Sequence, residues 1–447
     1  MANSPSDAEL IARYDGRVPR YTSYPTAPHF STTIDAGAYG RWLEAVPAGA
    51  NVSLYLHVPF CDRLCLYCGC NTAVVRHEAP KRAYARHLVE EIGLVAARLG
   101  RRATVTQVHW GGGTPTCLPE DCLTGIMDHI RRDFAVAPDA EVAIEIDPTS
   151  LTAAGLDALK LMGVTRASLG VQDFDLRVQE AIGRHQSFEQ TQCCAEGLRR
   201  LGVTSLNLDL IYGLPFQTEE SVARTARQSL ALRADRVAVF GYAHVPWMKK
   251  HQALIQDETL PGPAARFAQT GIIRRILVEE GGYLAAGLDH FALPSDAMGQ
   301  AAQAQALHRG FQGYTTDAAP VLIGLGASAI GALPQGYVQN ATAVPAYNAA
   351  IAHGEFAVAR GVALSADDRL RRGVIDAIMC DLAADIPDEL LEDAAALVPL
   401  AEDGLVQWDG RRVTVTERGR PFLRNAAAVF DAYLQRSSAA LRHSAAV

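Results

Sequence analysis

Six short apolar runs, each followed by a longer stretch suited to a helix, constrain the fold of this 447-residue chain more than any other feature. The runs have the length of β-strands, and they are Val52–Val58, Val105–Trp110, Glu141–Asp147, Ala167–Gln172, Leu206–Ile211 and Val237–Tyr242. The stretches between them are Ala83–Leu99, Leu118–Phe134, Leu151–Met162, Phe188–Leu201 and Glu219–Leu232. This alternation predicts an α/β fold whose parallel sheet has right-handed crossovers. Because six units are too few to close an eight-stranded barrel, we expect a partial, open barrel.

The strands also alternate in polarity. In Val52–Val58 the even positions are apolar, while Ser53, Tyr55 and His57 share the other face. Later runs repeat the pattern, with polar or small residues on one face: Glu141, Glu145, Asp147, Ser168, Gly170, Gln172, Asn207 and Asp209. A parallel strand packed on both sides would be apolar on both faces. The pattern therefore predicts a barrel lumen that is wet or filled by a polar ligand. The long helices disfavour the alternative, an antiparallel sheet with one face in water.

After the sixth run the character of the chain changes. We expect a helix over Gly262–Gly281, loops over the Gly- and Ala-rich segment Asp289–Gly331, and mostly helices from Ser365 onward. A hairpin is expected over Leu405–Val415, where Asp409-Gly410 suits a tight turn. Four parts are predicted: an arm capping the active site (1–50), the partial barrel (51–290), a connecting region that completes the site (291–364), and a helical, winged-helix-like domain (365–447).

Four of the nine cysteines fall between residues 61 and 70, directly after the first strand. The triplet Cys61-x3-Cys65-x2-Cys68 can bind three irons of a [4Fe–4S] cube and leave the fourth iron open. S-adenosylmethionine (SAM) can chelate an open iron through its amino and carboxylate groups, and cluster reduction then cleaves SAM to a 5′-deoxyadenosyl radical. A zinc site with Cys70 as fourth ligand is the alternative. The one-residue spacing between Cys68 and Cys70 argues against it and is expected to point Cys70 away from the cube.

A glycine-rich turn, Gly111-Gly112-Gly113-Thr114-Pro115, directly follows the second strand. Glycines let backbone groups approach a ligand and offer it carbonyl and N–H groups. Such a turn is weak evidence alone, but it comes one strand–helix unit after the cysteine triplet. Together the two motifs favour a single cofactor site.

The charge balance excludes some classes of function. A formal net charge of −8 argues against a nucleic-acid surface, although a few arginines in a cleft could still bind an anionic small molecule. No apolar stretch approaches the roughly 20 residues that a membrane span needs. The N-terminus lacks the pattern of a signal peptide, so the cytoplasm is the expected location.

Several motifs carry a family resemblance along nearly the whole chain. They are Pro19–Ala27, Tyr55–Cys61, Cys68–Asn71, Gly111–Thr116, Glu145–Pro148, Gly170–Phe174, Asp209–Pro215, Tyr242–Pro246, Asp289–Phe291 and Phe311–Thr316. With them the sequence resembles the oxygen-independent coproporphyrinogen III oxidase family of the radical SAM superfamily. The resemblance implies oxidative decarboxylation of the ring A and B propionates of coproporphyrinogen III to vinyl groups, giving protoporphyrinogen IX. We also expect a monomer and an electron donor such as a flavodoxin or ferredoxin system, although the sequence does not identify the donor.

The resemblance further implies two bound SAM molecules. It places Tyr55, Tyr67, Gly112, Glu145 and Ile330 around the cluster-bound SAM. It places Gly113, Thr114, Gln172, Arg184, Asp209 and Ala243 around the second. The candidate catalytic residues are Tyr55, His57 and Cys70. Two rivals are a related haem chaperone, which typically lacks Cys70-Asn71 and the Arg20–Ala27 motif, and a radical SAM methyltransferase of the same subfamily.

The N-terminal segment Arg17–Ala27 is rich in Arg, Tyr and Pro. Proline stiffens such a segment, and an arginine can bind a carboxylate with two hydrogen bonds. A substrate with four propionates needs local cations in an acidic chain. We therefore predict that this segment belongs to the active site. The alternative is an arm that only packs on the domain surface.

Overall fold

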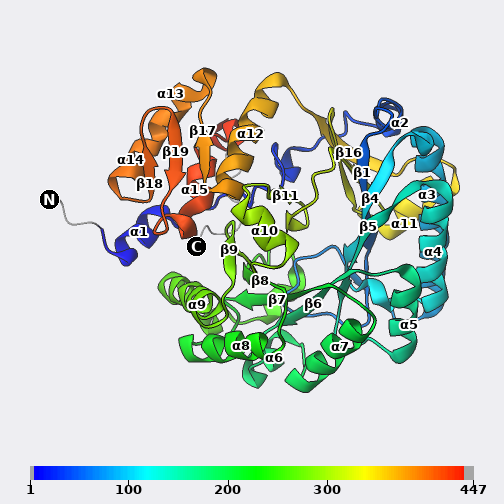
Figure 1. The fold of residues 1–447 in the computed structure, drawn as a ribbon, viewed down its shortest axis with the longest axis horizontal. Helices are drawn as coiled ribbons and strands as arrows, with labels where there is room; N and C mark the ends of the chain where they lie inside the picture. Colours follow the sequence, from blue (N-terminus) through cyan, green and yellow to red (C-terminus); the bar gives the residue numbers. More distant parts are fainter. Residues whose placement is uncertain (1–4, 437–447) are drawn as a thin grey trace.

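The computed structural model describes residues 5–436, and its main element is a twelve-stranded sheet (Figure 1). Six parallel neighbours follow one another in sequence order: β1 (Asn51–Val58), β4 (Thr104–Gly112), β5 (Ala135–Ile146), β6 (Arg166–Gln172), β7 (Ser205–Tyr212) and β8 (Arg236–Gly241). They confirm the six predicted runs. The sheet ends at β16 on one side and β9 on the other, so the barrel is partial and open, as expected.

Helices connect these strands and cover their outer side (Figure 1). They are α3 (Glu78–Leu99), α4 (Glu120–Asp133), α5 (Ala153–Met162), α6 (Leu176–Ile182), α7 (Phe188–Arg200) and α8 (Glu219–Ala231). Thr152, Ser187 and Thr218 cap three of them by accepting a backbone N–H of the first turn. The apolar face of β1, from Val52 to Val58, is fully buried in the main core beneath these helices.

The Gly- and Ala-rich segment Asp289–Gly331 is not a loop, and that expectation was wrong. It contains β13 (Val321–Leu325), which pairs in parallel with β1. A Cβ on Gly324 would lie 2.7 Å from the carbonyl carbon of Ile330, so this glycine marks a close approach of two strands. The sheet continues from β13 through three antiparallel strands: β14 (Ile330–Leu333), β15 (Gly336–Asn340) and β16 (Val358–Ala363).

The remaining elements surround this sheet. Its other edge carries β10 (His290–Ala292) and β9 (Leu284–Ala286), and the expected helix after β8 is α9 (Pro263–Arg275). A two-stranded pair flanks the cysteine loop, β2 (Phe60–Cys61) and β3 (Ala73–Val74). The other short elements are α2 (Ala36–Glu44), α10 (Ala297–Gln303), β11 (His308–Gly310), β12 (Gly313–Thr315) and α11 (Val344–Ala352).

The C-terminal part is a helical unit around a small antiparallel sheet. Its strands are β17 (Ala383–Asp385), β18 (Val406–Trp408) and β19 (Arg412–Val415). Its helices are α12 (Ala366–Asp381), α13 (Leu391–Ala394), α14 (Val398–Glu402), α15 (Leu423–Ala428) and α16 (Ala432–Arg436). β18 and β19 form the expected hairpin, and Gly410 in its turn has a φ of 93°. Residues 437–447 of the predicted domain lie outside the described residues.

The N-terminal arm packs on this C-terminal unit, and Figure 1 shows the blue α1 (Asp7–Tyr14) beside the orange and red elements. Tyr21 and Tyr24 are almost fully buried in the same apolar cluster as Phe430. The Tyr21 hydroxyl donates a 3.0 Å hydrogen bond to Asp431. Within residues 5–436, no helix is both long and apolar enough to cross a bilayer.

Candidate active site

A cavity of about 500 Å³ lies at the carboxyl ends of the parallel strands, where the loops of α/β barrels form their sites. Thirteen of the predicted site residues line it: Cys61, Cys65, Tyr67, Cys68, Cys70, Gly112, Gly113, Thr114, Glu145, Gln172, Arg184, Asp209 and Ala243. Ser168 and Asp209 belong to the polar strand faces, so these faces do line a hollow lumen. Arg20 of the N-terminal arm also lines the cavity.

Three predicted residues lie outside the lining of this cavity. Tyr55 and His57 sit on β1, next to the glycine-rich turn. Ile330 lies on β14 and packs against a small cluster that contains Phe30 and Tyr337. Tyr55 therefore contacts the glycine-rich turn that lines the cavity but does not line the cavity itself. Ile330 belongs to an apolar cluster.

The cysteine loop brings three thiols to one wall of the cavity. The Arg184 guanidinium donates to the Cys65 sulfur at 3.5 Å, and the Thr114 hydroxyl donates to the Cys61 sulfur at 3.7 Å. Among the described residues, no three His, Cys, Asp or Glu side chains converge tightly enough to hold one metal ion. In a cube each iron takes a single thiolate, so its three cysteines stand farther apart than zinc ligands do.

Cys70 does not point away from the other thiols, and this expectation was wrong. Its side chain hydrogen-bonds to the Cys68 thiol, and this contact lowers the pKa of Cys68. The accessible surface of Cys70 faces the cavity.

Three residues that sequence reasoning missed hold the cysteine loop from outside. Lys249 donates to the Cys70 carbonyl at 2.7 Å, and the Gln252 amide donates to the Tyr67 carbonyl at 2.8 Å. His251 Nε2 lies 2.8 Å from the Cys68 carbonyl and must donate, because a carbonyl only accepts. No motif marks these side chains, because each acts on backbone 179 to 185 residues away.

The glycine-rich turn is needed because other groups occupy the space of its side chains. A Cβ on Gly111 would lie 2.7 Å from Glu145 Oε1, and a Cβ on Gly112 would lie 2.7 Å from the His57 ring. Gly112 also has a φ of 112°, which side chains rarely adopt. Its N–H donates to Glu145 Oε2 at 3.1 Å. Bare backbone therefore faces the cavity beside the carboxylate of Glu145.

Tyr55 and His57 form a fixed neutral pair. His57 Nε2 donates to the Asn71 carbonyl at 3.2 Å, so its Nδ1 is free to accept the Tyr55 hydroxyl at 3.1 Å. Burial lowers the pKa of His57 and raises that of Tyr55 well above its usual value. Both side chains stay uncharged near neutral pH, and they hold their orientation without titrating.

Asp209 is the most strongly desolvated carboxylate of the lumen. Ser168 and Asn207 each donate a 2.8 Å hydrogen bond to it. Burial raises the pKa of Asp209 to about 6, and the charge of Glu145 adds to this, while the Ser168 bond opposes it. A positively charged or hydroxyl-bearing ligand would add a further partner to this buried acceptor.

Comparisons with known proteins cover most of the chain. Residues 55–228 match the radical SAM superfamily. An oxygen-independent coproporphyrinogen III oxidase from Bradyrhizobium diazoefficiens is 51% identical, over 96% of this chain and 97% of that protein. The enzyme of that name from Escherichia coli is 39% identical, over 97% and 96%. A solved structure of the Escherichia coli coproporphyrinogen III oxidase, described as a radical SAM enzyme, superposes with a TM-score of 0.89 at 37% identity, over 96% of this chain and 99% of that one. The chain therefore belongs to the oxygen-independent coproporphyrinogen III oxidase family of the radical SAM superfamily.

Proposed function

We propose that this protein decarboxylates the ring A and B propionates of coproporphyrinogen III to vinyl groups without oxygen, giving protoporphyrinogen IX in haem biosynthesis. The observation that carries the proposal is the 51% identity to a named oxidase over nearly the whole of both chains. In each half-reaction a propionate loses a hydrogen atom from its β-carbon and its carboxylate leaves as carbon dioxide. One electron passes to an acceptor, and a vinyl group remains.

Membership of the superfamily implies a [4Fe–4S] cluster and SAM. When bound, these two groups supply a carbon radical able to take hydrogen from an unactivated carbon. The residues present fit them: Cys61, Cys65 and Cys68 would hold the cluster, and the Gly112 backbone lines the same cavity as these cysteines.

Two SAM molecules are the finer proposal. Around the cluster-bound SAM we place Tyr55, Tyr67, Gly112 and Glu145. Around the second we place Gly113, Thr114, Gln172, Arg184, Asp209 and Ala243. Glu145 and Asp209 are on strands two apart in the sheet, which gives two acceptors at different positions of one cavity. Ile330 would contribute only indirectly, through its packing beside the site.

The chain's own residues position groups and exclude water. The neutral Tyr55–His57 pair keeps a hydroxyl beside Glu145, and Cys70, next to Cys68, is our candidate for a group that acts on the substrate radical or its proton. The arm of residues 1–50 is proposed as a cap, because Arg20 lines the cavity. The barrel (51–290), connecting region (291–364) and C-terminal domain (365–447) are the other proposed parts. We further propose a cytoplasmic monomer that accepts electrons from a flavodoxin or ferredoxin.

An anaerobic turnover assay tests the proposal. Reconstituted protein, SAM, a reducing system and coproporphyrinogen III should give protoporphyrinogen IX with loss of two carbon dioxide molecules, resolved by mass spectrometry. A methylated tetrapyrrole would instead favour the methyltransferase rival. Haem binding with no decarboxylation would favour the haem chaperone.

A further inference from the structure

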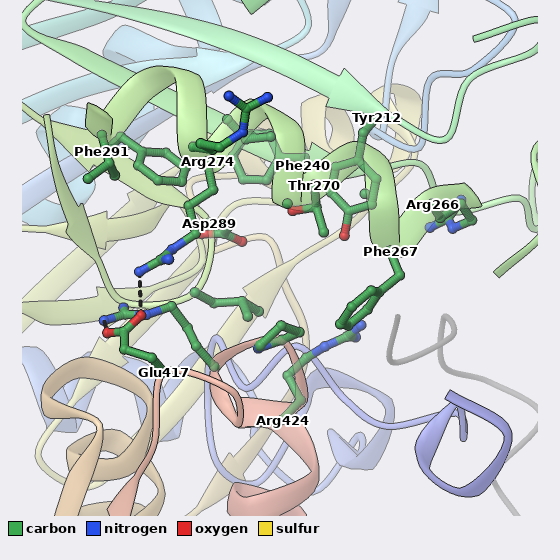
Figure 2. A pocket seen from close by; sticks show the side chains of 18 of the residues that line it. Tyr212, Phe240, Arg266, Phe267, Thr270, Arg274, Asp289, Phe291, Glu417 and Arg424 are labelled. Atoms are coloured by element: carbon green, nitrogen blue, oxygen red, sulfur yellow. Dashed lines mark hydrogen bonds and ion pairs between the residues drawn. The ribbon is translucent and has the colours of Figure 1, made fainter. Parts of the chain in front are cut away.

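A second cavity, of about 300 Å³, adjoins the first (Figure 2). Arg20, Phe240, Gly241 and Tyr242 line both of them. The second cavity extends from this shared wall between α9 and the C-terminal unit. Figure 2 shows Glu417 and Arg424 on the C-terminal side, with Phe267 and Arg274 of α9 opposite them. The two cavities therefore meet at a wall that contains Gly241.

The second cavity is strongly cationic in a chain whose net charge is −8. Seven arginines line it against three carboxylates, those of Glu279, Asp289 and Glu417. Glu417 already binds Arg274 at 2.5 Å and Arg420 at 2.9 Å. Asp289 lies 2.7 Å from His290 and 4.0 Å from Arg309. Two of the three carboxylates are therefore paired with cations, and arginines outnumber carboxylates in the described lining of the cavity.

Two of the arginines meet at the shared wall. Arg20 donates to the Gly241 carbonyl at 3.0 Å. The Arg266 guanidinium lies over the Tyr212 ring, and its Nη2 is 3.2 Å from where a Cβ of Gly241 would be. Within residues 5–436, neither Arg20 nor Arg266 forms an ion pair with a carboxylate. Both guanidinium groups therefore lie at the wall that the two cavities share, where they can bind an anion.

A third arginine is close enough to feel the charge of the first. Burial lowers the pKa of Arg424 to about 10, and the positive charge of Arg20 is the next largest cause. Arg424 itself is buried, and like charges held close together cost free energy that a bound anion would offset. The walls between them are aromatic, from Phe240, Phe267 and Phe291. Such a lining suits a ligand with an apolar ring body and carboxylates at its rim.

We propose that Arg20, Arg266 and Arg424 form a carboxylate subsite for the propionates of the tetrapyrrole that do not react. The reacting propionate then extends past Gly241 into the cavity of the cysteines. This inference rests on the proposed function for the identity of the ligand. It adds which residues grip the substrate and from which side.

Direct binding tests the subsite without turnover. The probe is coproporphyrin III, the stable, fluorescent, oxidised counterpart of the substrate with the same four propionates, titrated anaerobically into the cluster-loaded protein with SAM present. Loss of one charge-assisted hydrogen bond should weaken binding about tenfold in Arg266→Gln and in Arg424→Gln. Arg266→Lys keeps the charge but not the planar guanidinium group. Its affinity for coproporphyrin III should lie between that of the Gln variants and that of the wild type. Affinity should also fall as salt is raised.

The matched control is Arg227→Gln, which removes an exposed arginine that pairs with Glu280 on the outside of the molecule. It should bind coproporphyrin III like the wild type. Circular dichroism and thermal melting must show that each variant is folded. Should Arg424→Gln fail to fold, Arg266→Gln and Arg266→Lys still decide the matter.

The subsite is overturned if folded Arg266→Gln binds coproporphyrin III within twofold of the wild type. The proposed function fails separately. If the arginine variants weaken binding but the wild type makes no protoporphyrinogen IX, the subsite stands and the decarboxylation does not. If turnover occurs and the variants bind normally, the function stands and the subsite does not.

Discussion

The two adjoining cavities differ in charge and in how the chain builds them. The cavity of the cysteines is lined by thiols, glycines and lumen carboxylates that sit at the ends of consecutive parallel strands. The arginine cavity adds the arm, α9, β11 and the C-terminal unit to the ends of β7 and β8. The cavity of the cysteines is therefore built by the parallel strands and the loops that follow them. The arginine cavity forms only when four distant segments pack together. We infer a division of labour, with reaction chemistry in the first and substrate carboxylates in the second.

The largest effect should come from the cluster ligands. Replacing Cys61, Cys65 or Cys68 by Ala removes one of three thiolates. Cluster content and activity should then fall by more than the roughly 100-fold lost when an outer-shell partner of a metal site is removed. Iron content and visible absorbance of the reconstituted protein measure it. Coproporphyrin III binding should persist in these variants, since the arginine cavity is untouched. A variant that keeps full iron and activity contradicts the assignment.

Cys70 offers the matched comparison, because it lies in the same loop beside Cys68. Cys70→Ser should retain a four-iron cluster while turnover falls, since we expect it to act on the substrate and not on iron. Iron loss equal to that of Cys68→Ser would make Cys70 a ligand.

The next effect concerns one SAM site. Asp209→Asn removes a charge without changing shape, and it should weaken one of two SAM sites about tenfold or more while leaving the cluster intact. Equilibrium dialysis counts the sites. Asp128→Asn, on the exposed side of α4, is the control and should bind like the wild type. A single site in the wild-type protein contradicts the two-site proposal.

The same carboxylate predicts a pH dependence. The pKa of Asp209 is raised to about 6, so its ionised form dominates above that pH. Wild-type affinity at the second SAM site should drop as pH falls from 8 through 6, and Asp209→Asn should show no such drop. Equal pH profiles for the two proteins would remove Asp209 from this role.

A smaller effect tests the passage between the cavities. In Gly241→Ala the new Cβ would lie 2.9 Å from the Tyr212 hydroxyl and 3.2 Å from Arg266, so these side chains must move. We expect the KM for coproporphyrinogen III to rise several-fold, within the range for one crowded contact, with SAM affinity unchanged. Gly93→Ala, on an open face of α3, is the control. An unchanged KM would mean that the substrate does not extend past Gly241 from one cavity into the other.

The smallest effect on activity is expected at Glu91, a buried carboxylate outside both cavities. It accepts from the Gly326 N–H, Asn340 and the Tyr347 hydroxyl at 2.6, 2.6 and 2.8 Å. Burial raises its pKa to about 7, above the 4.5 of an exposed Glu. The folded state therefore holds a proton that the unfolded state releases, and stability falls as pH rises from about 4.5 to 7.

Glu91→Gln should remove the change in stability between about pH 4.5 and 7. It should also lower the free energy of unfolding by about 1–3 kcal/mol, because one donor loses its acceptor. Urea unfolding at several pH values measures both. Turnover at saturating substrate should stay within about twofold, the change expected away from a site. An unchanged slope with pH would mean that Glu91 does not titrate in this range.

The contrast between the cavities also explains what could be predicted from the sequence. The cysteines, the glycine-rich turn and Asp209 follow or lie on strands with clear alternation, so their meeting at one sheet edge was predictable. The partners Lys249, His251 and Gln252 were not, since they bind backbone and carry no pattern. Strand β13 was missed because glycine is typical of loops, whereas Gly324 here allows two strands to approach closely. The position of Arg20 at the cavity was expected from its motif, but the meeting of Arg20 with Arg266 and Arg424 depends on packing of remote segments.

An anaerobic crystal structure of the cluster-loaded protein with SAM and coproporphyrin III tests the division of labour most directly. The account predicts iron density against the sulfurs of Cys61, Cys65 and Cys68, and a tetrapyrrole crossing Gly241 with propionates on Arg20 and Arg266. A tetrapyrrole bound with its carboxylates away from the arginine cavity would contradict it.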